Sequence, residues 1–150
     1  MFLGQAVHTI DEKNRLAIPA RFRADLATGL YVTKGVDRCL YVMTPAAWEQ
    51  LAERIRTLPS MQADARRLQR HFFSGADHLV PDKLGRIIVP PSLREYANLQ
   101  GEVVIAGVNS RIELWDRATW DAEEADADLQ TATLAEQVAA IDGQLPELGI

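Results

Sequence analysis

One motif occurs twice in this chain. The segment DEKNRLAIP occupies residues 11–19, and DKLGRIIVP occupies residues 82–90. Asp, Arg and Pro recur at the same positions, and each segment continues to a further arginine, Arg23 or Arg94, at an offset of 71 residues. Downstream the offset becomes 72, and Val32, Gly35 and Trp48 align with Val104, Gly107 and Trp120. A repeat of this length is too long for a solenoid unit, so the sequence predicts two copies of one small module.

The composition is typical of a soluble protein. Of 150 residues, 47% are hydrophobic and 25% are charged, and no apolar stretch approaches the ~20 residues that span a bilayer. The N-terminal residues lack the pattern of a signal peptide. The single Cys39 cannot form an internal disulfide, which fits a reducing compartment. We therefore expect a cytoplasmic protein made of one compact domain or two closely packed halves.

Charge is unevenly distributed along the chain. The formal net charge of -5 would disfavour contact with nucleic acid. Residues 1–100, however, hold 14 Lys and Arg against 10 Asp and Glu, whereas residues 101–150 hold 2 against 11. A mildly basic body thus precedes an acidic segment, and the distribution of charge matters more for nucleic-acid contact than its total.

Each copy predicts the same order of elements. A strand over 5–10, a turn at 11–14 and a strand over 15–18 come first, and Asn14 aligns with Gly85, both of which tolerate the left-handed backbone of tight turns. Pro19 and Pro90 end these strands and begin short helices. Hairpins follow over 30–43 and 102–115, with Gly35 and Gly107 as turn glycines. The continuous run Ile87-Ile88-Val89 predicts a strand covered on both faces.

Longer helices follow each hairpin. Thr44 and Asp116 are suitable N-cap residues, and Trp48, Leu51, Ile55 and Leu58 then recur at helical spacing. A second helix is expected over 60–72, and an acidic helix from Trp120 to about Ile141. Gly143 and Pro146 predict a frayed C-terminus.

An Asp-x-x-x-Arg motif followed by a hydrophobic strand and proline, present twice at this spacing, resembles the MraZ proteins of bacteria. The start MFLG and the segments RIIVP at 86–90 and AGVN at 106–109 also look like that family. The resemblance covers roughly residues 1–142. Proteins of this family carry tandem SpoVT/AbrB-type, swapped-hairpin DNA-binding domains.

The resemblance implies an α+β fold in which two AbrB-like modules interdigitate into one small β-barrel-like core with flanking helices. Repeat 1 is expected over 1–59, a linking helix over 60–72, repeat 2 over 73–120, and an acidic helix and tail over 121–150. The family implies a ring-shaped homo-oligomer that binds direct repeats in promoter double-stranded DNA. It would associate with the nucleoid and regulate, commonly repress, the division and cell-wall gene cluster. No cofactor, metal, small-molecule ligand or membrane partner is expected.

Arg15 and Arg86, at the roots of the two turns, are the expected main DNA contacts, because a guanidinium can pair with guanine or clamp phosphate. Other cations would hold the phosphate backbone; these are Lys13, Lys83, Arg21, Arg23 and Arg94. The turn motif itself comprises Asp11, Asn14, Asp82 and Gly85. Lys83 aligns with Glu12 rather than with Lys13, so the two turns are not expected to make equivalent contacts.

Other interpretations stay open at this point. Each Asp–Arg pair has the spacing of a structural ion pair across its turn, which is compatible with DNA contact. Arg66, Arg67 and Arg70 predict a solvated helix face or a subunit contact. An antitoxin-like interaction module and a structural ring protein are the alternative functions. An enzyme is not expected, because His71 and His78 lack metal-ligand spacing and Cys39 lacks an activating partner.

Overall fold

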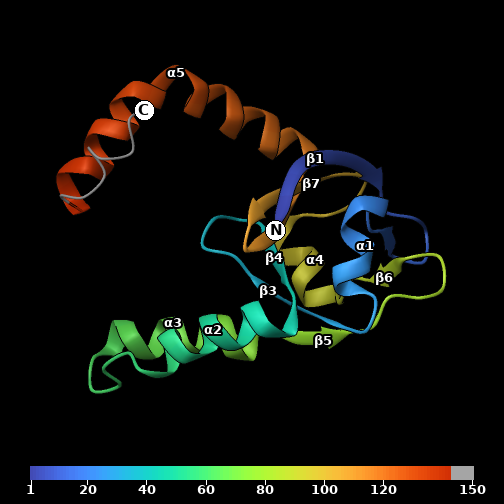
Figure 1. The fold of residues 1–150 in the computed structure, drawn as a ribbon, viewed down its shortest axis with the longest axis horizontal. Coiled ribbons are helices and arrows are strands. Elements are labelled where there is room, and N and C mark those ends of the chain that lie inside the picture. Colours follow the sequence, from blue (N-terminus) through green and yellow to red (C-terminus); the bar gives the residue numbers. More distant parts are fainter. Residues whose placement is uncertain (143–150) are drawn as a thin grey trace. The chain divides into compact units, whose positions relative to one another are not determined.

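The computed structural model describes residues 1–142 and has an α+β fold, as the sequence predicts (Figure 1). Repeat 1 supplies β1 to β4 and repeat 2 supplies β5 to β8. In chain order the elements are β1 Phe2–Thr9, β2 Arg15–Ala17, α1 Ala20–Leu26, β3 Leu30–Lys34, β4 Leu40–Met43, α2 Pro45–Arg56, α3 Ala63–Ser74, β5 Asp77–Leu79, β6 Arg86–Ile88, α4 Pro91–Ala97, β7 Glu102–Asn109, β8 Arg111–Asp116 and α5 Arg117–Asp142.

Both sheets contain strands from both repeats. The main sheet has six strands in the order β1-β7-β8-β4-β3-β5, and the described pairs are antiparallel. The first strand of each repeat pairs with the third strand of the other, β1 with β7 and β5 with β3. β2 and β6 form a separate two-stranded ribbon. Neither repeat therefore completes its own sheet.

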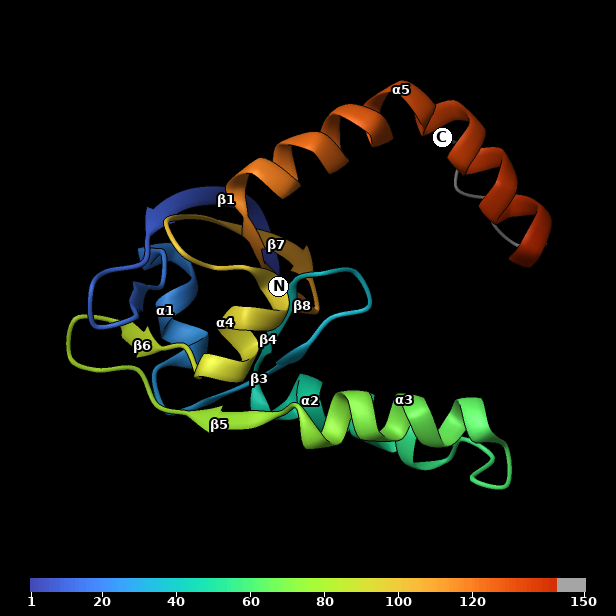
Figure 2. The same cartoon turned by 180° about the vertical axis from the view of Figure 1, so that it is seen from behind.

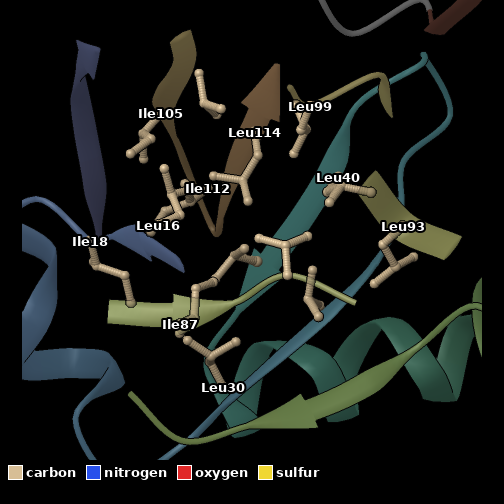
Figure 3. Close-up of a cluster of buried hydrophobic side chains, with 14 of the residues drawn as sticks. Leu16, Ile18, Leu30, Leu40, Ile87, Leu93, Leu99, Ile105, Ile112 and Leu114 are labelled. Carbon is tan, nitrogen blue, oxygen red and sulfur yellow. The ribbon is translucent and has the colours of Figure 1, made fainter. Parts of the chain in front are cut away.

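The hydrophobic core lies between these elements and is shared by both repeats. Figure 3 shows side chains from the ribbon, from the main sheet and from α4 converging in one cluster, among them Leu16, Ile87, Ile112 and Leu93. Phe22 and Leu26 of α1 belong to the same cluster. Burying one such side chain stabilises a fold by about 1.5–3 kcal/mol, and four short strands of one repeat could not cover this surface alone.

Helices α2 and α3 lie side by side (Figures 1 and 2) and pack against β3. Helix α2 begins as predicted, because Thr44 Oγ1 accepts a hydrogen bond from the Ala47 amide at 3.2 Å. The buried hydroxyl of Thr33 donates to the Phe72 carbonyl and joins α3 to the sheet. Trp48 stacks on Tyr31 with ring centroids 5.3 Å apart, so it packs between helix and sheet as an anchor.

Several expectations are corrected. β1 starts at Phe2 rather than at residue 5, and α3 begins at Ala63 rather than at residue 60. Gly107 is not in a turn but within β7, opposite Gly4 of β1. The prediction that residues 87–89 are covered on both faces is wrong, because Ile88 is 61% exposed. Gly143 and Pro146 lie outside the described residues.

The chain divides into two compact units, Met1–Arg117 and Ala118–Ile150. Up to Asp142 the second unit is the continuation of α5, which confirms the helix expected after Trp120. Within residues 1–142, no helix combines the length and the apolar character needed to cross a membrane.

Gly107 gives a test of the exchanged strand pairing. A Cβ atom at this position would lie 2.6 Å from backbone atoms of Phe2 and Leu3. We expect Gly107→Ala to force β1 away from β7 and to lower the free energy of unfolding by about 1–3 kcal/mol. Chemical denaturation would measure this. Gly101→Ala is the control, because a Cβ there meets no atom within 4 Å. An equal loss of stability in both variants would contradict the close contact between β1 and β7 at Gly107.

Candidate nucleic-acid interface

The β2–β6 ribbon sorts its side chains onto two faces. In its antiparallel register Arg15 lies opposite Ile88, Leu16 opposite Ile87, and Ala17 opposite Arg86. Paired residues point to the same face and successive residues alternate. Leu16 and Ile87 are 1% and 3% exposed, so they face the core. The outward side chains form what we call the ribbon face, which consists of Arg15, Ala17, Arg86 and Ile88.

Turn 1, residues 11–15, is held together by one aspartate. Asp11 Oδ1 accepts hydrogen bonds from the backbone amides of Lys13 and Arg15, both at 2.9 Å. Asp11 Oδ2 accepts from Arg15 Nε at 2.7 Å. The Asn14 amide donates to the Asp11 carbonyl, and Asn14 adopts a left-handed conformation with φ 62°. The carboxylate thus fixes both the turn and the arginine at its root.

Turn 2, residues 82–86, repeats this geometry. Asp82 Oδ1 accepts from the amides of Leu84 and Arg86 at 2.9 Å, and Asp82 Oδ2 accepts from Arg86 Nε at 2.8 Å. Gly85 has φ 75° and takes the place of Asn14. The two sequences therefore build the same turn, and the structural ion pair that the Asp–Arg spacing left open is present in both copies.

The ion pairs leave part of each guanidinium available. Both arginine side chains are 29% exposed and bind aspartate through Nε. Within residues 1–142, their terminal Nη nitrogens have no hydrogen-bond partner. Arg15 and Arg86, 71 residues apart in sequence, line one surface hollow of about 250 Å³ together with Val80 and Ile88. The fold thus brings the two expected main contacts onto one surface.

Each turn is also bonded to the strand end of the other repeat. The Ile18 amide donates to the Gly85 carbonyl at 2.8 Å, and the Val89 amide donates to the Asn14 carbonyl at 3.2 Å. The turns therefore cannot move independently of the ribbon. In Figures 1 and 2 the loops that carry them extend to the same side of the body.

The other predicted cations are placed differently. Arg23 Nε donates to the Ile18 carbonyl, and the Arg23 side chain lies against Gly85 of turn 2. Arg94 makes the matching bond to the Val89 carbonyl, next to turn 1. Lys13 and Lys83 are exposed at the two turns. Arg21 instead donates to the Gln5 carbonyl of β1, so it bonds to the main sheet rather than to a turn.

Residues away from the ribbon have other surroundings. Arg66, Arg67 and Arg70 are exposed on α3, which fits both the solvated face and the subunit contact considered for them. His71 Nε2 contacts the Gly35 carbonyl at 2.9 Å. Burial raises the pKa of Cys39 to about 12, which keeps its thiol protonated. In the described part of the chain, no three His, Cys, Asp or Glu side chains are grouped to hold a metal ion.

Sequence reasoning missed the apolar part of this surface. Val80 and Ile88 are each 61% exposed beside the arginines. Their counterparts at the offset of 71 residues are Thr9 and Ala17, so the repeat alignment already carried a signal that the two copies differ here.

The turn aspartates should titrate below their usual range. The hydrogen bond from the Arg15 amide is the largest cause that lowers the pKa of Asp11, and the Arg86 amide does the same for Asp82. The ionised carboxylates therefore stabilise the turns above about pH 3.8, and this stabilisation is lost as pH falls through the lowered pKa. Between pH 8 and 5 the turns should not change.

Carboxyl chemical shifts measured by NMR over an acid titration would test this. We expect the Asp11 midpoint to lie below 3.8, and to rise only in part in Arg15→Ala, because that variant keeps the backbone donors. Asp82 with Arg86→Ala is the matched pair. A full return to 3.8 in either variant would show that the guanidinium, not the backbone, controls the carboxylate.

Comparison with known proteins agrees with this architecture of two copies. The family profile described as "MraZ protein, putative antitoxin-like" matches the chain twice, over residues 1–71 and 72–141. A protein of Moorella thermoacetica named "Transcriptional regulator MraZ" is 45% identical over 142 residues, which cover 95% of this chain and 99% of the relative.

A protein of Desulforamulus reducens with the same name is 45% identical over 138 residues, covering 92% of this chain and 97% of its own length. Both alignments cover nearly the whole of both chains. With the family profile found once in each repeat, these relatives show that the chain belongs to the MraZ family.

Proposed function

We propose that this protein is a sequence-specific, DNA-binding transcriptional regulator whose ribbon face enters the major groove. The observation that carries the proposal is the convergence of Arg15 and Arg86 on one hollow of the outward face. A two-stranded ribbon fits the major groove, where the terminal nitrogens of an arginine can pair with guanine. The relatives named as transcriptional regulators support the same assignment.

The Asp–Arg pairs suit this role. A long cationic side chain loses conformational freedom when it binds, and the Asp11 and Asp82 bonds at Nε restrict Arg15 and Arg86 beforehand. The Nη atoms have no hydrogen-bond partner within residues 1–142 and would therefore be available to a base or a phosphate. Lys13, Lys83 and the nearby arginines of α1 and α4 would then hold the backbone phosphates and set the register.

The exchanged strand pairing supports the swapped-hairpin, AbrB-like form of the fold. Repeat 1 over 1–59 and repeat 2 over 73–120 would be its two modules, joined by the segment 60–72, which holds most of α3, and followed by the acidic segment over 121–150. β1 pairing with β7 and β5 pairing with β3 is the arrangement that exchange between two equivalent modules produces.

One ribbon offers few cations, so a single protomer should bind weakly. A ring-shaped homo-oligomer would present several ribbons to direct repeats in a promoter, and effective concentration then raises avidity by ~10²–10⁴. The proposed target is the promoter of the division and cell-wall gene cluster, which the protein would repress in association with the nucleoid. The acidic C-terminal segment would disfavour DNA contact elsewhere on the surface.

The test is fluorescence anisotropy on DNA from the region upstream of the chain's own gene, against scrambled DNA, over a salt series. The variant Arg15→Ala/Arg86→Ala should bind the upstream DNA at least about 30-fold more weakly, since each guanine contact provides ~1–3 kcal/mol of discrimination. Its salt dependence should also become shallower.

Arg67→Ala/Arg70→Ala is the control, because it removes the same charge from the exposed face of α3. Light scattering and denaturation would establish that all variants keep their assembly and fold. If both double variants bind DNA equally weakly, the loss reflects the removed charge and not a specific contact by Arg15 and Arg86. Sequence-independent binding by the intact wild type would contradict the proposal and favour the antitoxin-like interaction module.

Lysine variants separate base contact from phosphate contact. Arg15→Lys and Arg86→Lys keep the charge but lose the planar fork of the guanidinium. We expect them to retain binding to scrambled DNA and to lose most of the preference for upstream DNA. If either variant keeps the full preference in competition anisotropy, that arginine contacts phosphate only.

A further inference from the structure

Repeat 2 carries three exposed apolar side chains on its hairpin that repeat 1 lacks. Val80, Leu84 and Ile88 are 61%, 62% and 61% exposed. At the offset of 71 residues the counterparts in repeat 1 are Thr9, Lys13 and Ala17. The two turns have the same hydrogen bonds and a positive φ at the same position, and β2 and β6 have the same length, so at the turns and the ribbon the difference is one of side-chain chemistry and not of backbone.

The apolar side chains lie among the arginines. Ile88 is directly opposite Arg15 in the ribbon, and directly opposed side chains are neighbours on the same face. Val80 and Ile88 line the same hollow as Arg15 and Arg86. At the other end of the ribbon Arg86 lies opposite Ala17, whose methyl group is too short to reach as far. Each end of the ribbon face thus has one arginine, but only one end has a long apolar side chain.

This mixture restricts what can cover the surface. An apolar protein patch would bury the outward Nη atoms of two arginines without partners, at a cost. The floor of the DNA major groove offers both kinds of partner, the O6 and N7 acceptors of guanine for an arginine and the C5-methyl group of thymine for an apolar side chain.

Resting on the DNA-binding function proposed above, we infer that Ile88 contacts a thymine methyl group beside the base read by Arg15, and that Ala17 makes no such contact. Ile88 is then a specificity-determining residue. The consequence is orientation: a ribbon with two equivalent ends would fit DNA equally well in either direction, whereas direct repeats have one direction. Because only the Ile88 end of the ribbon makes this contact, the ribbon binds the DNA in one direction.

Uracil replacement tests this contact, because uracil lacks only the C5-methyl group of thymine. Anisotropy would compare the upstream duplex with its uracil-substituted copy for wild type, Ile88→Ala and Val36→Ala. We expect wild type to bind the uracil duplex about four-fold more weakly for each methyl group that Ile88 would otherwise bury. Ile88→Ala should bind the thymine duplex more weakly by the same factor and should no longer distinguish the two duplexes.

Val36→Ala shortens another exposed aliphatic side chain, 71% exposed and away from the ribbon, and should behave as wild type. Ala17→Ile tests the same contact by adding an apolar side chain instead of removing one. It copies Ile88 onto the other end of the ribbon, so the preference for thymine over uracil should increase. The salt dependence should be the same in every variant, since no charge changes.

The outcomes distinguish failure of this inference from failure of the function on which it rests. Equal binding of both duplexes by wild type, or an unchanged thymine preference in Ile88→Ala, would overturn the inference while DNA recognition stands. If Ile88→Ala changes the oligomer size and keeps the thymine preference, the apolar side chains belong to a subunit contact. This result would also overturn the inference. If wild type does not prefer upstream DNA, both proposals fail together.

Discussion

The pairing of β2 with β6 is the constraint on which the rest of this structure depends. Each strand has only three residues and belongs to a different repeat, so neither is stable by itself. Their pairing places Leu16 and Ile87 in the shared core and leaves Arg15 and Arg86 on the outward face. The amides of Ile18 and Val89, which bond the opposite turns, lock the arrangement from both sides.

The two aspartates act within this frame. Asp11 and Asp82 each satisfy two backbone amides and one guanidinium, which makes the turn rigid before any ligand arrives. An ion pair and a DNA contact are not exclusive here, because the pair uses Nε and leaves the Nη atoms without a hydrogen-bond partner within residues 1–142. A ligand that binds the ribbon face therefore meets arginines already fixed in place, and less conformational entropy is lost on binding.

The two repeats have similar turns but differ in exposed side chains. Asn14 and Gly85 keep the backbone alike, since both accept a positive φ. Ala17 and Ile88, by contrast, give the ribbon two different ends. If the proposed DNA recognition holds, this difference between the two ends would let the ribbon distinguish the two directions of a target.

The sequence by itself determined the local structure: the two turns, the order of elements and the spacing that allows each Asp to pair with its Arg. These depend on contacts within a few residues. Tertiary structure decided which strands of one repeat pair with strands of the other, that Gly107 lies within β7 rather than in a turn, and that Ile88 is exposed beside Arg15. A hydrophobic run shows that apolar surface exists, but which face is buried depends on partners about 70 residues away, and local sequence does not record them.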